Sequence, residues 1–195
     1  IAVIDNGINF GLPVFGACTA PGMPAGCKVV ASVNFGTGTS DTSHGTNVSA
    51  IMLGVAPGAR IAMLNAFSGG SATSAAIIAA IDWAVYHRPV HNIVSINMSL
   101  AQINFWYYQP CESSNEFLTP VATARAAGIA VVAATGNMAV KTGLPKPACT
   151  PGVVSVGAVY DANLGSVGAG FCSDATTSVD KVACFSNSAS YLTLL

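Results

Sequence analysis

The chain has 195 residues, of which 52% are apolar and 8% are charged, and its formal net charge is −1. This length fits one domain or part of one, and the apolar fraction allows a large buried core. Lysine and arginine are scattered singly, which argues against nucleic acid and anionic membranes as the main partners. No uninterrupted apolar run approaches the roughly 18 residues of a membrane-spanning helix.

Short apolar runs alternate along the chain with segments of helical periodicity. Strands are predicted at 1–4, 28–35, 60–67, 92–98, 129–134, 153–159 and 181–185. Strands that alternate with helices indicate a parallel sheet with helices on both faces, which is a three-layer α/β fold. The strands are continuously apolar, as a sheet covered on both sides requires.

Three helices are predicted between these strands. The first follows Ser43, a suitable N-cap residue, and carries His44 on its first turn. The apolar positions that predict its buried face are Val48, Ile51, Met52 and Val55. Ser71 is expected to cap the second helix, which ends before Pro89, and the third spans 115–127 with Gly128 at its C-cap.

Polar residues follow several of the predicted strands, namely Asp5, Ser99 and the pair Gly136-Asn137. The carboxyl ends of parallel strands share one edge of the sheet, so these groups can lie together there. Asp5 is suited to accept a hydrogen bond from His44 and to fix the tautomer of its ring. Asn137 is suited to donate an N–H to an oxyanion. Turn formation is the plainer interpretation of both sites.

Six cysteines are present, without the spacing of a zinc site. An even number, with few charges, favours disulfides and an oxidising compartment, so we expect an extracellular or periplasmic protein. We favour Cys18–Cys27 and Cys172–Cys184, because each pair closes a short loop, and Cys111–Cys149 is left by elimination. Six reduced, buried thiols in a cytosolic protein are the alternative.

Both ends of the sequence are expected to be truncated. The chain begins with Ile1 inside a predicted strand and stops in the apolar run 191–195. Residues 1–195 are therefore interpreted as a single domain that is incomplete at both ends, and the fold as incomplete at the C-terminus.

Seven short blocks of the sequence carry a family resemblance. They are IAVIDNG at 1–7, HGTNV at 44–48, VAPGA at 55–59, NMSL at 97–100, AATGN at 133–137, VSVGA at 154–158 and FSN at 185–187. In this order they closely resemble the subtilisin-like serine proteases (subtilases, peptidase family S8). The resemblance implies the α/β fold of that family and endopeptidase activity on peptide or protein substrates, without a cofactor.

The resemblance also implies roles for particular residues. It places the triad aspartate at Asp5, the general base at His44 and the oxyanion-hole amide at Asn137. The substrate-binding segment corresponds to 99–101 (Ser99, Leu100 and Ala101), which can pair with an extended peptide, together with Gly136. We expect the complete protein to be a monomer.

Three positions depart from the family pattern: Asn6 replaces the usual Ser or Thr, Asn47 replaces a second His, and Ala101 replaces a Gly. The added methyl group of Ala101 narrows the expected entrance to the specificity pocket. Calcium is frequent in the family, but the few acidic residues form no cluster of oxygen ligands, so no metal site is assigned.

The largest departure is the absence of the nucleophile block Gly-Thr-Ser-Met-Ala. Gly38-Thr39-Ser40 does not replace it, because it precedes His44, whereas the order in subtilisin is Asp, His, Ser. In subtilisin the serine follows the histidine by roughly 157 residues and the oxyanion asparagine by roughly 66. Only 151 residues follow His44 and 58 follow Asn137. We therefore expect the serine beyond Leu195 and expect the 195-residue chain alone to be inactive.

Two other functions are alternatives to the protease. A non-catalytic subtilase-like domain that binds peptide remains open, and the residue at the nucleophile position decides between it and the protease. A nucleotide-binding α/β domain is disfavoured, because no glycine-rich phosphate loop follows the first strand.

Overall fold

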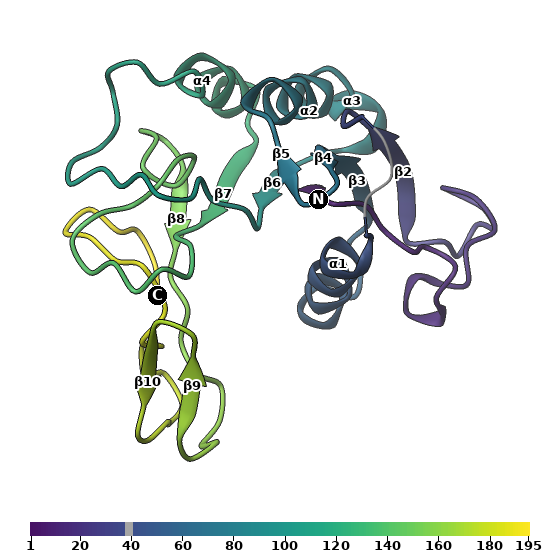
Figure 1. Ribbon diagram of the computed structural model, residues 1–195. Coiled ribbons are helices and arrows are strands. Elements are labelled where there is room, and N and C mark those ends of the chain that lie inside the picture. Colours follow the sequence, from purple (N-terminus) through teal and green to yellow (C-terminus); the bar gives the residue numbers. More distant parts are fainter. Residues whose placement is uncertain (38–40) are drawn as a thin grey trace. The chain divides into compact units, whose positions relative to one another are not determined.

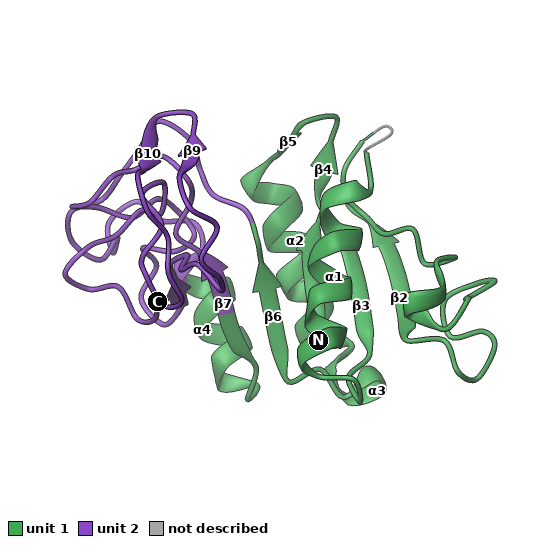
Figure 2. Cartoon of the chain, turned by 90° about the horizontal axis from the view of Figure 1, so that it is seen from below, with its two compact units in different colours: residues 1–99, 119–131 green, residues 100–118, 132–195 purple. Residues whose placement is uncertain are grey.

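The computed structural model describes residues 1–37 and 41–195 (Figure 1). The chain forms two compact units (Figure 2). Unit 1 comprises Ile1–Ser99 and Thr119–Val131, and unit 2 comprises Leu100–Leu118 and Val132–Leu195.

Unit 1 is built on a parallel sheet whose strands run in the order β2-β3-β1-β6 (Figure 2). These strands are β1 (Ala2–Asp5), β2 (Val29–Asn34), β3 (Ile61–Asn65) and β6 (Ser95–Met98). The central strand β1 pairs in parallel with both β3 and β6 and is buried along its whole length. The amide of Ala130, the first residue of β7 (Ala130–Ala134), donates to the Val94 carbonyl at 3.0 Å. The parallel sheet predicted from the apolar runs is thus confirmed.

Helices cover both faces of this sheet (Figure 1). One face carries α1, and the other carries α2, α3 and α4. Their bounds are Ser43–Val55 for α1, Ser74–Tyr86 for α2, Arg88–His91 for α3 and Leu118–Ala126 for α4. Of the described helices, none is long and apolar enough to cross a membrane.

The buried face of α1 differs from the predicted one. Of the four predicted positions, Val48 and Met52 are partly buried and pack against the core, but Ile51 and Val55 are 65% and 84% exposed. The fully buried positions are Gly45, Ser49 and Leu53. These three recur every fourth residue and so lie on one side of the helix. The small side chains let α1 approach the sheet closely, and Leu53 joins a buried cluster with Val3, Phe15, Val29, Ile61 and Met63.

Several predicted boundaries are also corrected. Ser71 does not cap α2, because it belongs to a small hairpin of β4 (Phe67–Ser68) and β5 (Ser71–Ala72). The cap is Thr73, whose Oγ1 accepts from the Ala76 amide at 3.2 Å. Asn115 does not begin the third helix, because its Oδ1 accepts from the Phe117 amide just before α4.

Unit 2 holds the rest of β7, which pairs in parallel with β8 (Val154–Val156). The strand predicted at 181–185 does not form, and only Val182 makes an isolated bridge, to Val159. Between Val159 and Val182 the sequence forms an antiparallel hairpin that was not predicted. Its strands are β9 (Val167–Ala169) and β10 (Cys172–Asp174).

Three disulfides close loops in the two units. Cys18–Cys27 lies in unit 1, and Cys111–Cys149 and Cys172–Cys184 lie in unit 2. These are the pairs that the sequence favoured, and no cysteine is free. A 3-10 turn, η1 (Pro13–Phe15), precedes the first of them.

Candidate active site

Asp5 ends the central strand of unit 1 with its side chain 1% exposed. A carboxylate that is buried needs donors around it. The Asn6 amide supplies one, to Oδ1 at 2.8 Å, and His44 supplies another.

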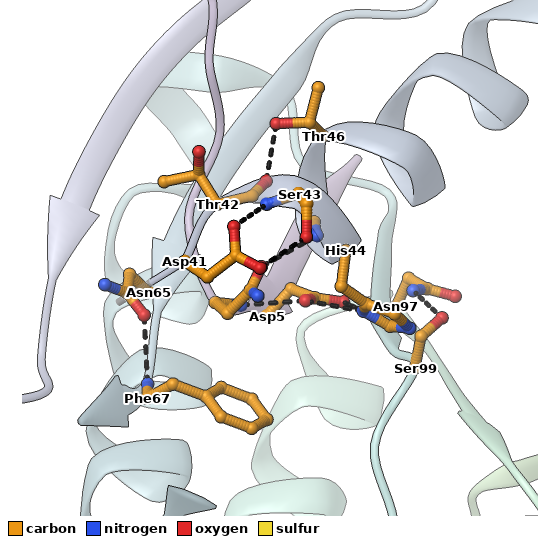
Figure 3. A network of polar contacts seen from close by, with 12 residues as sticks. Asp5, Asp41, Thr42, Ser43, His44, Thr46, Asn65, Phe67, Asn97 and Ser99 are labelled. Carbon is orange, nitrogen blue, oxygen red and sulfur yellow. Dashed lines mark hydrogen bonds and ion pairs between the residues drawn. The ribbon is translucent and has the colours of Figure 1, made fainter. Parts of the chain in front are cut away.

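His44 is the second residue of α1, and its Nδ1 lies 2.8 and 3.0 Å from the two carboxylate oxygens of Asp5 (Figure 3). The contact predicted between these residues is therefore present. The carboxylate orients the ring and favours the tautomer with the proton on Nδ1, which leaves Nε2 to accept a proton. The His44 side chain is 57% exposed, so a substrate can reach the ring.

Asn6 and Gly45 join the strand end to the helix start. The Asn6 Oδ1 accepts from the Gly45 amide at 2.8 Å, which satisfies one of the free donors of the first helical turn. A Cβ at Gly45 would lie 2.3 Å from the Gly7 carbonyl oxygen and 3.1 Å from the Asp5 Cβ. Only glycine fits here, and this close approach is what brings His44 to Asp5.

Ser43 does not cap α1 as the sequence suggested. The N-cap is Thr42, without a side-chain cap bond, and Ser43 follows it inside the helix. The Ser43 hydroxyl donates to Asp41 Oδ2 at 2.6 Å, and its amide donates to Oδ1 at 2.9 Å (Figure 3). These bonds hold the pKa of Asp41 below its usual value. The Ser43 hydroxyl proton is therefore engaged by a carboxylate. Gly38-Thr39-Ser40 lies outside the described residues.

The predicted substrate segment is irregular chain and half-buried. Ser99, the last residue of this part of unit 1, accepts at Oγ from the Asn97 amide group at 3.0 Å. Leu100 and Ala101 begin unit 2. A Cβ at Gly136 would lie 3.2 Å from the Ala101 methyl, so these two residues are close neighbours within that unit.

Asn137 is exposed, in the irregular loop that follows β7 in unit 2. Gly136 before it has a φ of +87°, a left-handed conformation that suits glycine. That Asn137 lies at the same edge of the sheet as the Asp5–His44 pair stays a prediction. In the part of the chain that the structure describes, no three His, Cys, Asp or Glu side chains are grouped to hold a metal ion.

Asn187, for which the sequence predicted no role, is central to the hydrogen bonds of unit 2 around Asn137. Asn187 is fully buried, and its side chain makes three hydrogen bonds to the loop that carries Asn137. Its signal in the sequence was the block FSN at 185–187, which the family resemblance used without giving it a function.

Comparison with known proteins identifies the family of this chain. The family model described as "Subtilase family" matches residues 1–193, and the chain belongs to the subtilase family. The chain is 32% identical to subtilisin-like protease 2 of Trichophyton tonsurans over 172 residues and 31% identical to that of Trichophyton equinum over 170. Each match covers 80% of this chain and 35% of the relative, so the chain spans about a third of their length.

Solved structures share the fold at lower identity. A cold-adapted subtilisin-like serine proteinase superposes with a TM-score of 0.65 at 23% identity, covering 99% of this chain and 60% of that one. The patellamide maturation protease PatA gives 0.64 at 22% identity, covering 97% and 60%. The mostly parallel α/β fold predicted from the sequence is the subtilisin-like fold of these proteins.

Proposed function

We propose that the protein to which this chain belongs is a secreted endopeptidase with an Asp-His-Ser triad. The observation that carries this proposal is the buried Asp5 carboxylate held against Nδ1 of the exposed His44. In this proposal His44 takes the proton of an attacking serine and returns it to the leaving amine, while Asp5 stabilises the imidazolium. Asn137 donates to the oxygen that becomes negative in the tetrahedral intermediate.

The nucleophile is proposed to lie beyond Leu195 in the full-length protein. Within the sequence, no Gly-Thr-Ser-Met-Ala block follows His44, and the spacing in subtilisin puts the serine about 157 residues after the histidine. Ser43 is a poor substitute, because its hydroxyl proton is bound to Asp41.

The substrate is proposed to be an extended peptide that pairs with the backbone of 99–101. A Cβ built on Gly136 would lie 3.2 Å from the Ala101 methyl, so the methyl group occupies space next to the Gly136 backbone. We propose an extracellular or periplasmic location, which the three disulfides favour. A monomer that needs no cofactor, nucleic acid or membrane completes the proposal.

The test uses the parent protein, including the segment after Leu195. It should cleave a peptide and take up a serine-directed fluorophosphonate, whereas residues 1–195 alone should do neither. His44→Ala should lower kcat by about 10⁶, and Asp5→Asn by about 10⁴, as such changes do in subtilisin and trypsin-like enzymes. Each variant should be checked for native folding before its rate is interpreted.

The competing function is a peptide-binding domain without catalysis. A folded parent protein with no serine at the nucleophile position, which binds peptide with no cleavage, would establish it. Cleavage and labelling by the 195-residue chain, free of contaminants, would contradict the proposed position of the nucleophile.

A further inference from the structure

The loop 135–140 after β7 has no helix or strand of its own. It contains two residues in the left-handed region, Gly136 with a φ of +87° and Ala139 with a φ of +58°. A non-glycine residue in that region is strained, by about 1–3 kcal/mol, and persists only where its surroundings hold it. The conformation of this loop therefore depends on contacts from elsewhere in unit 2.

Asn187 supplies the central contacts. Its Oδ1 accepts from the backbone amides of Met138 and Val140, both at 3.0 Å, and its Nδ2 donates to the Thr135 carbonyl at 2.8 Å. Its own amide donates to the Gly136 carbonyl at 3.0 Å. One buried side chain thus bonds the loop on both sides of Asn137.

The backbone around Asn187 reinforces this arrangement. The Ala139 amide donates to the Phe185 carbonyl, and the Ser188 amide donates to the Val140 carbonyl, each at 2.8 Å. Asn187 itself is 0% exposed, so water does not replace its bonds without opening unit 2. Buried polar groups whose partners are all satisfied hold a segment in one conformation.

We propose that Asn187 is a positioning residue that fixes the backbone on both sides of Asn137 and so presets Asn137 for oxyanion stabilisation. This inference rests on the proposed function. A donor stabilises an oxyanion only when it is in place before the charge develops, so loosening the loop should reduce kcat more than it changes KM.

The test compares Asn187→Ala with a matched control, Asn115→Ala, in the parent protein. Asn115 is also a buried asparagine of unit 2, 8% exposed, and its side chain bonds to Cys111, Thr150 and Phe117. Both variants should lose stability. Per fluorophosphonate-titrated site, only Asn187→Ala should lower kcat, by about 10- to 100-fold with KM little changed, because small misplacements have effects of that size.

A double-mutant cycle separates positioning from general destabilisation. Asn137→Ala alone should lower kcat by about 10²–10³. Adding Asn187→Ala should then lower kcat little further, because its effect acts through Asn137. Asn187→Asp keeps an acceptor for both amides but places an oxygen against the Thr135 carbonyl, so it should lower kcat as well. Should the alanine variant fail to fold, the Asp variant takes its place in the cycle.

Two results would overturn the positioning role of Asn187 while leaving the proposed function intact. One is an unchanged kcat in a labelled, active Asn187 variant, and the other is a fall in kcat that multiplies with that of Asn137→Ala in the double mutant. A parent protein that takes up no label and cleaves nothing would overturn both this inference and the proposed function.

Discussion

Gly45→Ala is the sharpest test of how the fold builds the Asp5–His44 pair. Within a helix, replacing glycine by alanine ordinarily stabilises a protein by about 0.4–1 kcal/mol, through the unfolded state. At Gly45 the new methyl would lie 2.3 Å from the carbonyl oxygen of Gly7 and 3.1 Å from the Cε of Met63. The first contact is with backbone, which cannot rotate away.

The geometry sets the size of the effect. Real methyl contacts begin at about 3.0 Å, so α1 and the chain after β1 must separate by about 0.7 Å. Overpacking of this kind costs about 1–3 kcal/mol, which outweighs the usual gain at a helical glycine. The same separation would lengthen the 2.8 Å contact between His44 and Asp5 beyond a good hydrogen bond. We expect a net loss of stability and, in the parent protein, a fall in kcat approaching 10².

Gly54→Ala is the matched control on the same helix. Gly54 is exposed, and a Cβ there would meet nothing within 4 Å. This variant should be as stable as the parent protein or slightly more stable, with unchanged kcat. Urea unfolding and peptide hydrolysis per titrated site measure both quantities. If Gly45→Ala behaves like Gly54→Ala in both assays, the close approach does not determine the site geometry.

Three further predictions concern stability, each checked by urea or thermal unfolding. Thr73→Ala should cost about 1 kcal/mol through the lost N-cap, whereas Ser71→Ala should change stability by less than about half of that; equal effects would contradict the assignment of the cap. Replacing Cys111 and Cys149 together by serine should cost about 4 kcal/mol, more than the loss of either shorter disulfide, because their separation of 38 residues closes the longest loop. Hydrogen bonds from the Lys181 ammonium and the Cys184 backbone amide lower the pKa of Asp174 in the folded protein below its ordinary value of 3.8. The ionised carboxylate therefore stabilises the fold fully above pH 3.8, and this stabilisation is lost as the pH falls through the lower folded-state pKa. Asp174→Asn should remove that acid-dependent step, and an unchanged acid transition would contradict it.

Much of the architecture follows from the sequence alone. Continuous apolar runs such as 1–4 and 129–134 predict strands buried on both faces, because only a covered parallel sheet hides every side chain. Strand ends then share an edge, which accounts for the place of Asp5, and the family resemblance paired Asp5 with His44, 39 residues away on the first turn of a helix. The two short disulfides followed from loop length, since nearby cysteines need little chain ordering to meet.

Other features depend on contacts that hydropathy does not encode. Val55 is as apolar as a core residue, yet it is 84% exposed, because Gly45 is the position that fits against the sheet. Ser71 had the chemistry of a cap, but its backbone is used by a hairpin, and Thr73 takes that role.

The environment of Asn137 shows most clearly that the sequence does not reveal contacts between distant segments. The Gly-Asn pair in sequence indicates a turn and an exposed amide, and both are local properties. The side chain that bonds to this loop belongs to Asn187, about 50 residues further along the chain, and only the folding of unit 2 brings the two segments together. Residue type and spacing could predict the groups that carry the chemistry. The buried hydrogen bonds that hold them in place are set by tertiary packing, because a polar side chain finds its partners only after distant segments have met.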